Sequence, residues 1–93
     1  MSDKTIFKYA LNRYVDITDL DLHIGAEILT VGIQGEDIVF WALVDMHEKA
    51  TERRSFAIVG TGWALPADQY LAKNYLGKVE EAPFVWHIFE VTK

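Results

Sequence analysis

The sequence predicts an all-β fold, a small antiparallel sandwich or open barrel of six to seven short strands with at most one short helix. Short segments rich in β-branched and aromatic residues alternate with turn residues along the whole chain. Three of these segments are apolar at nearly every position, which is typical of strands covered on both faces: residues 38–44, 56–59 and 84–89. A chain of 93 residues supports one hydrophobic core, so we expect a single domain, residues 1–93.

The N-terminal part indicates an opening pair of strands. Residues 5–10 (TIFKYA) are rich in β-branched and aromatic side chains, and Asn12 supplies a turn after them. In residues 14–20, Val15 and Ile17 alternate with polar side chains. This alternation predicts a second strand with one packed face and one solvated face.

A hairpin follows after Gly25. Residues 27–34 (EILTVGIQ) have the composition of a strand, and Gly35-Glu36 comes directly after them. Glycine at the first central position of a two-residue loop favours a primed hairpin turn. Residues 37–46 are therefore expected to pair back antiparallel to this strand.

The C-terminal half is expected to contain one strand, one short helix and a last hairpin. Residues 53–61 form the strand, and the glycines and proline after it end it. The spacing of residues 67–74 allows one or two helical turns. Residues 75–80 and 84–92 then pair across a turn that contains Pro83.

Composition and charge exclude several classes of function. Cysteine is absent, which rules out disulfides, cysteine metal sites and a thiol nucleophile. The net charge of −5 opposes binding to nucleic acid through phosphate neutralisation, although an acidic surface that imitates a nucleic-acid backbone is an alternative to a solvated acidic rim. No apolar run is long enough to span a bilayer and no hydrophobic signal segment opens the chain, so we expect a soluble, cytoplasmic protein without a membrane partner.

One set of residues has the chemistry of an anion or nucleotide site. A guanidinium suits phosphate, glycine exposes backbone N–H groups, a threonine offers a hydroxyl, and an indole stacks on a base. The candidate ligand-binding residues are Arg53, Arg54, Gly60, Thr61, Gly62 and Trp63. In the competing interpretation, the glycines only bend a loop and the arginines pair with Asp45 or Glu90.

The histidines and serines give little sign of catalysis. His87 lies in an apolar strand and is either a hydrogen-bonded core residue or a polar site residue facing a cavity. Asp45 and His47 have a spacing compatible with two metal ligands, but no second pair completes a set, so no metal and no cofactor are expected. Neither Ser2 nor Ser55 has a histidine at a recognisable spacing. The sequence predicts no catalytic residues, and enzyme activity is the less favoured class.

Apolar side chains on both faces of one strand predict self-association. In residues 37–46, Val39, Trp41 and Leu43 alternate with Phe40 and its neighbours, and both sets are apolar. One set belongs in the core and the other is free to form an interface. We expect a homodimer through one face of the strands at 37–46 and 84–92.

An ordered set of landmarks resembles a family of small uncharacterised proteins encoded by bacteriophages and prophages. The landmarks are KTIFKY, GAEILTVGIQ, FWALVD, ERRSFAIVGTG, LGKV and VWHIFE, and they extend from Lys4 to Glu90. The resemblance implies a virus-encoded accessory protein that acts in the cytoplasm of a host bacterium. Members of that family commonly have a histidine where this chain has Trp63, so the resemblance assigns no ligand role to this position.

These observations favour a protein that acts by stoichiometric binding. The leading hypothesis is binding to a host protein, such as a component of an antiviral defence system. The alternative is sequestration of a nucleotide signal by the arginines and the loop from Gly60 to Trp63. A small hydrolase and a structural component of the virion are the remaining alternatives.

Overall fold

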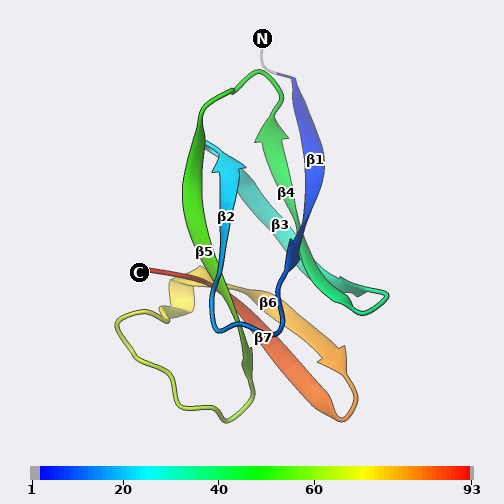
Figure 1. Ribbon diagram of the computed structural model, residues 1–93, viewed down its shortest axis with the longest axis vertical. Coiled ribbons are helices and arrows are strands. Elements are labelled where there is room, and N and C mark those ends of the chain that lie inside the picture. The colour runs from blue at the N-terminus through cyan, green and yellow to red at the C-terminus, as the bar shows by residue number, and fades with distance from the viewer. Residues whose placement is uncertain (1–2, 93) are drawn as a thin grey trace.

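The computed structural model describes residues 3–92, which form two antiparallel sheets packed face to face (Figure 1). One sheet has the strand order β1-β4-β3 and the other has the order β2-β5-β7-β6. The all-β sandwich predicted from the sequence is therefore confirmed. The strands are β1 (Lys4–Leu11), β2 (Thr18–His23), β3 (Glu27–Gln34), β4 (Asp37–Asp45), β5 (Thr51–Gly60), β6 (Tyr75–Glu81) and β7 (Phe84–Val91).

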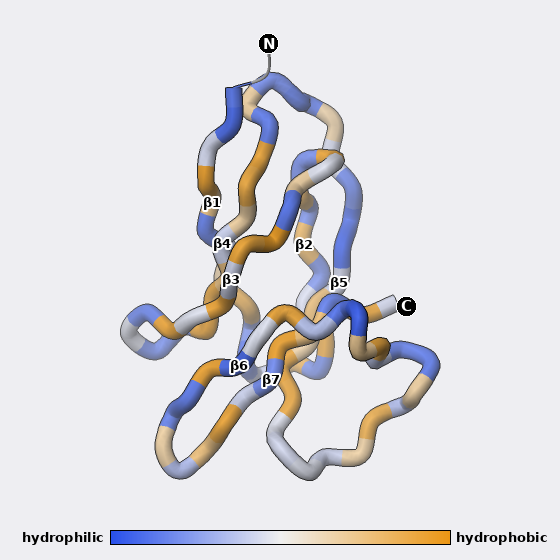
Figure 2. The backbone as a smooth tube through the Cα atoms, turned by 180° about the vertical axis from the view of Figure 1, so that it is seen from behind, coloured by the Kyte–Doolittle hydropathy of each residue, from blue (hydrophilic) through white to orange (hydrophobic). Residues whose placement is uncertain are grey.

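Two hairpins have the positions expected from their turn residues. Gln34 pairs with Asp37 across Gly35 and Glu36, and Gly35 has a φ of 59°, as a primed turn requires. β6 and β7 pair from Tyr75 to Phe89 and close at Glu81 and Phe84. Figure 2 shows that the tip of the β3–β4 hairpin is hydrophilic, whereas the strands that face each other carry the apolar segments.

The second strand begins later than the alternation of residues 14–20 predicts. The side chain of Asn12 accepts a hydrogen bond from the Tyr14 N–H (2.9 Å), and Thr18 Oγ1 accepts one from the Asn12 N–H (3.1 Å). These bonds hold residues 12–17 in a loop, so β2 starts only at Thr18. The expected helix at 67–74 is reduced to one 3-10 turn, Ala72–Asn74.

The core lies between the two sheets. Phe40 of β4 and Phe56 of β5 are fully buried, and their ring centroids are 4.6 Å apart. Tyr9 of β1 stacks on Phe40 at 5.1 Å. On β4, Phe40, Ala42 and Val44 point into the core, whereas Trp41 is only half-buried on the outer face of its sheet.

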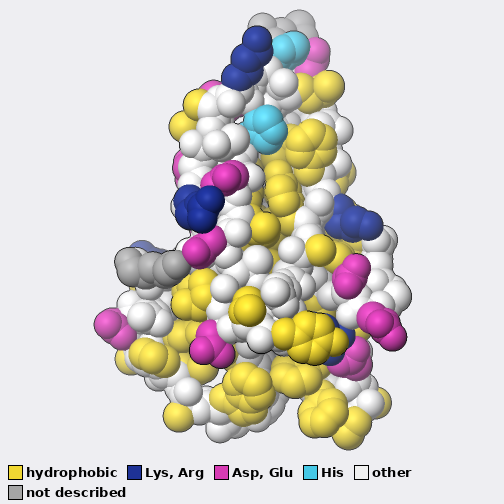
Figure 3. All heavy atoms as spheres, in the orientation of Figure 1, with side chains coloured by type: hydrophobic (Ala, Val, Ile, Leu, Met, Phe, Trp, Pro, Cys, Tyr) yellow, Lys and Arg dark blue, Asp and Glu magenta, His cyan; other side chains and the backbone are white. Residues whose placement is uncertain are grey.

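The sandwich is closed along one side and more open elsewhere. β3 of the first sheet lies against β6 of the second, and β1 has few contacts with β5 on the other side. Figure 3 shows hydrophobic side chains gathered at the lower end of the molecule, over the β6–β7 hairpin and the loop that follows β5. Within residues 3–92, no helix has the length and apolar character needed to cross a membrane.

Strand β5 continues beyond its neighbour β2. β2 pairs with β5 only as far as Phe56, where Thr18 is the partner. β5 continues to Gly60 and remains paired with β7 on its other side. Residues 57–60 therefore have a strand partner on one side only, and the chain diverges from β5 at residues 13–17.

Candidate binding site at the free edge of strand β5

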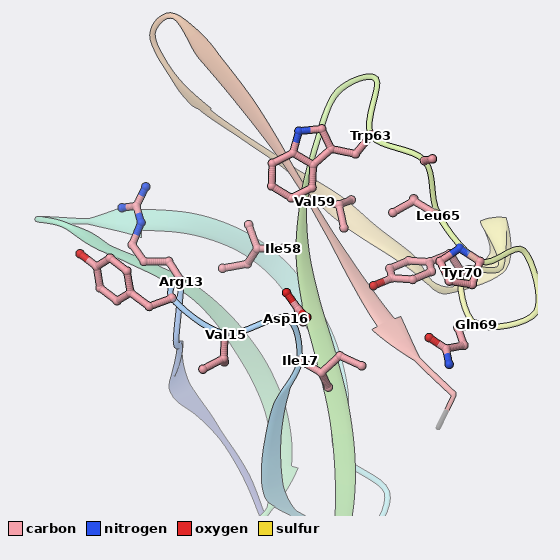
Figure 4. A pocket seen from close by; sticks show the side chains of 13 residues that line it. Arg13, Val15, Asp16, Ile17, Ile58, Val59, Trp63, Leu65, Gln69 and Tyr70 are labelled. Carbon is pink, nitrogen blue, oxygen red and sulfur yellow. The ribbon is translucent and has the colours of Figure 1, made fainter.

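A cavity of about 460 Å³ lies beside this free edge, and we call it the slot. Residues 13–17 of the β1–β2 loop form one wall, and residues 63–66 with Gln69 and Tyr70 of the long loop after β5 form the other. Ile58 and Val59 of β5 lie between the two walls (Figure 4). The volume is in the range that holds a small ligand or a short stretch of polypeptide.

The floor of the slot contains backbone groups without a strand partner. Every second residue of a strand directs its N–H and C=O to the same side, so two of the residues 57–60 direct theirs to the free edge. The carbonyl of Gly60 faces this edge and accepts a hydrogen bond from the Trp63 N–H (3.2 Å), so the alternation places Ile58 and Gly60 at the edge, and both are half-buried. Among the described residues, no backbone hydrogen bond joins this edge to the loop at 13–17. Within residues 3–92, the N–H and C=O of Ile58 and the N–H of Gly60 have no strand partner on this side, and because backbone polar groups away from bulk water require partners, the edge is suited to an occupant that supplies them.

The polar side chains of the slot include a carboxylate without an ionic partner. Asp16 and the Tyr70 hydroxyl both point into the slot (Figure 4). Burial raises the pKa of Tyr70, and the nearby negative charge of Asp16 raises that pKa further. In the part of the chain that the structure describes, Asp16 has no salt bridge and no hydrogen bond. The slot therefore has a negative charge that nothing else in it neutralises.

Trp63 forms an aromatic rim above these groups. Its side chain is 58% exposed and meets Trp86 edge to face, with ring centroids 5.9 Å apart. The indole lies over Gly60, where an added Cβ would be 2.7 Å from Nε1 of Trp63. Gly62 has a φ of 89°, which a residue with a side chain rarely adopts. The glycines of the GTG segment therefore set the position of Trp63.

Arg13 at the other end of the slot is held by groups outside it. Its guanidinium donates to the backbone oxygen of Glu36 (2.7 Å) and forms two hydrogen bonds with the carboxylate of Glu81. Glu81 also accepts a hydrogen bond from the Trp86 indole N–H (3.1 Å). In Figure 4 the guanidinium is turned away from Asp16. Arg13 thus connects three turns, and Glu81 balances its charge.

Glu81 should make stability depend on pH in the acid range. The hydrogen bonds from Arg13 and Trp86 lower the pKa of Glu81 below its ordinary value. As the pH falls from about 5 to about 3, the unfolded state binds a proton first, so the free energy of unfolding decreases. This contribution is lost once the pH is below the pKa of the folded state. In urea denaturation across this range, Glu81→Gln is expected to show a shallower acid loss than the parent.

Asp68→Asn is the matched control for this experiment. Asp68 is exposed and has no hydrogen bond or ion pair among the described residues, so Asp68→Asn makes the same change from acid to amide without removing a contact. Equal slopes for Glu81→Gln and the parent would show that the Arg13 network does not stabilise the folded state.

The two arginines of the predicted anion site lie far from Trp63. Arg53 lies seven residues before Gly60 on β5, a separation of about 23 Å along the strand. It pairs with Asp21 of β2 at 3.3 Å. Arg54 forms a bidentate pair with Glu90 (2.7 and 2.8 Å) and donates to the backbone oxygen of Ala26 (2.7 Å). The structure thus brings together Gly60, Thr61, Gly62 and Trp63 but not the arginines, and Arg54 makes the Glu90 pair of the competing interpretation.

His87 lies outside the slot on the outer face of the β2-β5-β7-β6 sheet. Its Nε2 is 2.6 Å from Thr61 Oγ1, and its Nδ1 is 2.8 Å from the Tyr75 hydroxyl. It is half-buried and is not a member of the core. Among residues 3–92, no carboxylate contacts His87. Its imidazole therefore bridges two hydroxyl groups and has no acidic partner.

The pair considered for metal binding is part of a turn. The Asp45 carboxylate accepts a hydrogen bond from the backbone N–H of His47 (2.9 Å), and His47 Nε2 is 3.3 Å from Asp3. The described part of the chain contains no group of three histidine, aspartate or glutamate side chains arranged to hold a metal ion.

Sequence reasoning missed most of the slot. In the sequence, Asp16 does not differ from the other acidic residues expected at the solvated surface. Gln69 and Tyr70 lie in the segment that was expected to be helical. The available signals were the acidic Asp16 between apolar Val15 and Ile17, and the long stretch after Trp63 that lacks strand periodicity. Neither signal indicates that the two segments meet.

Residues 2–93 match the model of a family described as a domain of unknown function, DUF7352, and the chain belongs to this family. No curated protein and no solved structure gives a significant match to the chain. The geometry of the slot is therefore the basis for the functional argument.

Proposed function

We propose that this protein acts by stoichiometric binding and that the slot receives part of a partner protein. The observation that carries the proposal is the free backbone edge of residues 57–60 in a cavity of about 460 Å³. An exposed strand edge is a common site for the addition of a partner's segment, because main-chain hydrogen bonds supply the contact. The aromatic rim at Trp63 adds surface of the kind that carries binding energy.

The composition of the slot favours binding over catalysis. Its lining includes aromatic rings, an amide, a carboxylate and a guanidinium, but no serine, threonine, lysine or histidine. Its one carboxylate, Asp16, has no histidine, lysine or second carboxylate in the lining to act as its acid or base partner. The groups present can stack on a ring and can donate or accept hydrogen bonds, which are the interactions of a recognition site.

The resemblance to phage-encoded proteins suggests the setting for this binding. In that setting the partner is a protein of the host bacterium, for example a component of its antiviral defence. A small accessory protein can block such a partner simply by occupying one of its surfaces.

Filling the slot should abolish partner capture. Val15 lines the slot and is 47% exposed, so Val15→Trp places a large ring in the cavity without changing the core. Leu29 on β3 does not line the slot and is 49% exposed, which makes Leu29→Trp the matched control. Tagged protein is incubated with host-cell lysate, and the captured proteins are quantified by mass spectrometry.

At least one host protein should be captured by the parent and by Leu29→Trp, and about tenfold less by Val15→Trp, while all three melt at similar temperatures. Identical capture profiles for the two variants would exclude the slot as the binding surface.

A nucleotide is the second candidate occupant, because Trp63 offers an exposed plane on which a base can stack. Its phosphates would need a free cation. Arg53, Arg54 and Arg13 are each engaged by a carboxylate, which makes this candidate weaker. Melting of the protein with a panel of nucleotides tests it, and a stabilisation removed by Trp63→Ala would favour it over a protein partner.

Self-association remains a further expectation. β4 and β7 lie in different sheets, so the two strands first considered do not form one face. The outer face of β1 and β4 carries Ile6, which is 57% exposed, opposite half-buried Leu43. We expect sedimentation equilibrium at micromolar concentration to give twice the monomer mass of 10.6 kDa, and Ile6→Lys to restore the monomer.

Ile24→Lys is the control, because Ile24 is 46% exposed in the turn after β2 and belongs to neither β1 nor β4. A parent protein that sediments as a monomer would refute the dimer, and dimers that persist in Ile6→Lys would exclude this face.

A further inference from the structure

We infer that the segment received by the slot is an extended strand that carries a lysine or arginine, and that this cationic side chain lies against Asp16 beneath Trp63. The inference rests on the proposed function and specifies the chemistry of the partner. Two independent features carry it, the free backbone edge of β5 and the unneutralised charge of the slot.

The backbone edge determines the conformation of the occupant. Residues 57–60 already have strand geometry, because they pair with β7 at Ala57, Ile58, Val59 and Gly60. An incoming strand meets N–H and C=O groups at the spacing of a β-ladder. It also continues the line of β2, which occupies the same side of β5 as far as Phe56 and then leaves it. About three to four residues of the partner fill this length of edge.

The charge determines the side chain. Asp16 points into the slot and has no ionic partner among residues 3–92, whereas the charge of Arg13 is balanced by Glu81. An anionic ligand would therefore be repelled by Asp16 without meeting a free cation. A lysine or arginine would pair with that carboxylate, and the net charge of −5 would favour its approach.

The aromatic side chains fit the same occupant. The exposed Trp63 ring stands at one rim and the Tyr70 ring at another (Figure 4). A cation next to an indole face is attracted by the ring electrons, and the methylene stem of lysine or arginine covers apolar surface. Ile58, Val59 and Leu65 provide that apolar surface inside the slot.

Selection of peptides tests the inference directly. A library of random displayed heptapeptides is selected on the full-length protein, with Val15→Trp used for counter-selection. The peptides recovered should share a lysine or arginine at one position. Synthetic copies are then measured by calorimetry, together with versions that carry norleucine at the basic position or N-methyl groups on alternate backbone nitrogens.

Binding should weaken about tenfold or more when norleucine replaces the basic residue, and by a similar factor for Asp16→Asn, since a hydrogen bond between charged groups is lost in each. Asp37→Asn is the matched control. Asp37 is exposed and has no ion pair among the described residues, so its variant makes the same change of charge outside the slot and should bind within about twofold of the parent. Bound peptide should also slow amide hydrogen exchange in residues 57–60, and N-methylation should abolish binding.

Each contrary result overturns a defined part of the inference. Recovered peptides without a common basic residue, or unchanged binding by Asp16→Asn, would exclude the cationic side chain. Full binding by N-methylated peptides would exclude strand addition, and a library that yields no binders would overturn both parts. The proposed function fails separately, if Val15→Trp captures host proteins as the parent does.

Discussion

Phe56→Ala is expected to lower the free energy of unfolding by about 3–5 kcal/mol. Phe56 is fully buried and contacts Phe40 of the opposite sheet, with centroids 4.6 Å apart. Removing the ring leaves a cavity at the point where the two sheets meet. A domain of this size has a total stability of about 5–15 kcal/mol, so the variant loses a large share of it.

Urea denaturation followed by tryptophan fluorescence measures this loss. Phe84→Ala makes the same chemical change at a site that is 56% exposed, and we expect it to cost about 1 kcal/mol or less. A similar cost for the two variants would mean that the sheets do not meet through the Phe40–Phe56 contact.

Arg54→Ala is expected to cost about 1.5–3 kcal/mol, the range for hydrogen bonds to charged groups in partly buried surroundings. The side chains of Arg54 and Glu90 are 17% and 26% exposed, and the guanidinium also donates to the backbone oxygen of Ala26. Arg54 thus links β5, β7 and the turn between β2 and β3. Its removal leaves the Glu90 carboxylate and the Ala26 carbonyl without a donor.

The neighbouring Arg53 supplies the control. Its pair with Asp21 is exposed, with side chains 65% and 57% accessible, so Arg53→Ala should cost less than about 1 kcal/mol. A double-mutant cycle of Arg54→Ala with Glu90→Gln should give a measurable coupling energy. The same kind of cycle for Arg53 and Asp21 should give a coupling energy close to zero. Equal costs for Arg53→Ala and Arg54→Ala would contradict a structural role specific to Arg54.

The sequence by itself determined the class of the fold and the local elements. Alternating and continuous apolar segments predict strands because side chains on a strand point to opposite faces every second residue. The Gly35-Glu36 turn and the last hairpin were predictable because their geometry depends on adjacent residues. The start of β2 was misplaced, since the hydrogen bonds of Asn12 with Tyr14 and Thr18 override the alternation of residues 14–20.

Only the tertiary structure decided which segments meet. Residues 13–17 and 63–70 are far apart in the sequence, and they form one slot because β2 leaves β5 after Phe56 while β5 continues along β7. In the same way, the pairing of Arg54 with Glu90 depends on β5 lying beside β7. The order of strands in a sandwich depends on the burial of the whole core, to which residues far apart in the sequence contribute. The residues next to Asp16 or Arg54 in the sequence therefore do not predict which strands will be neighbours.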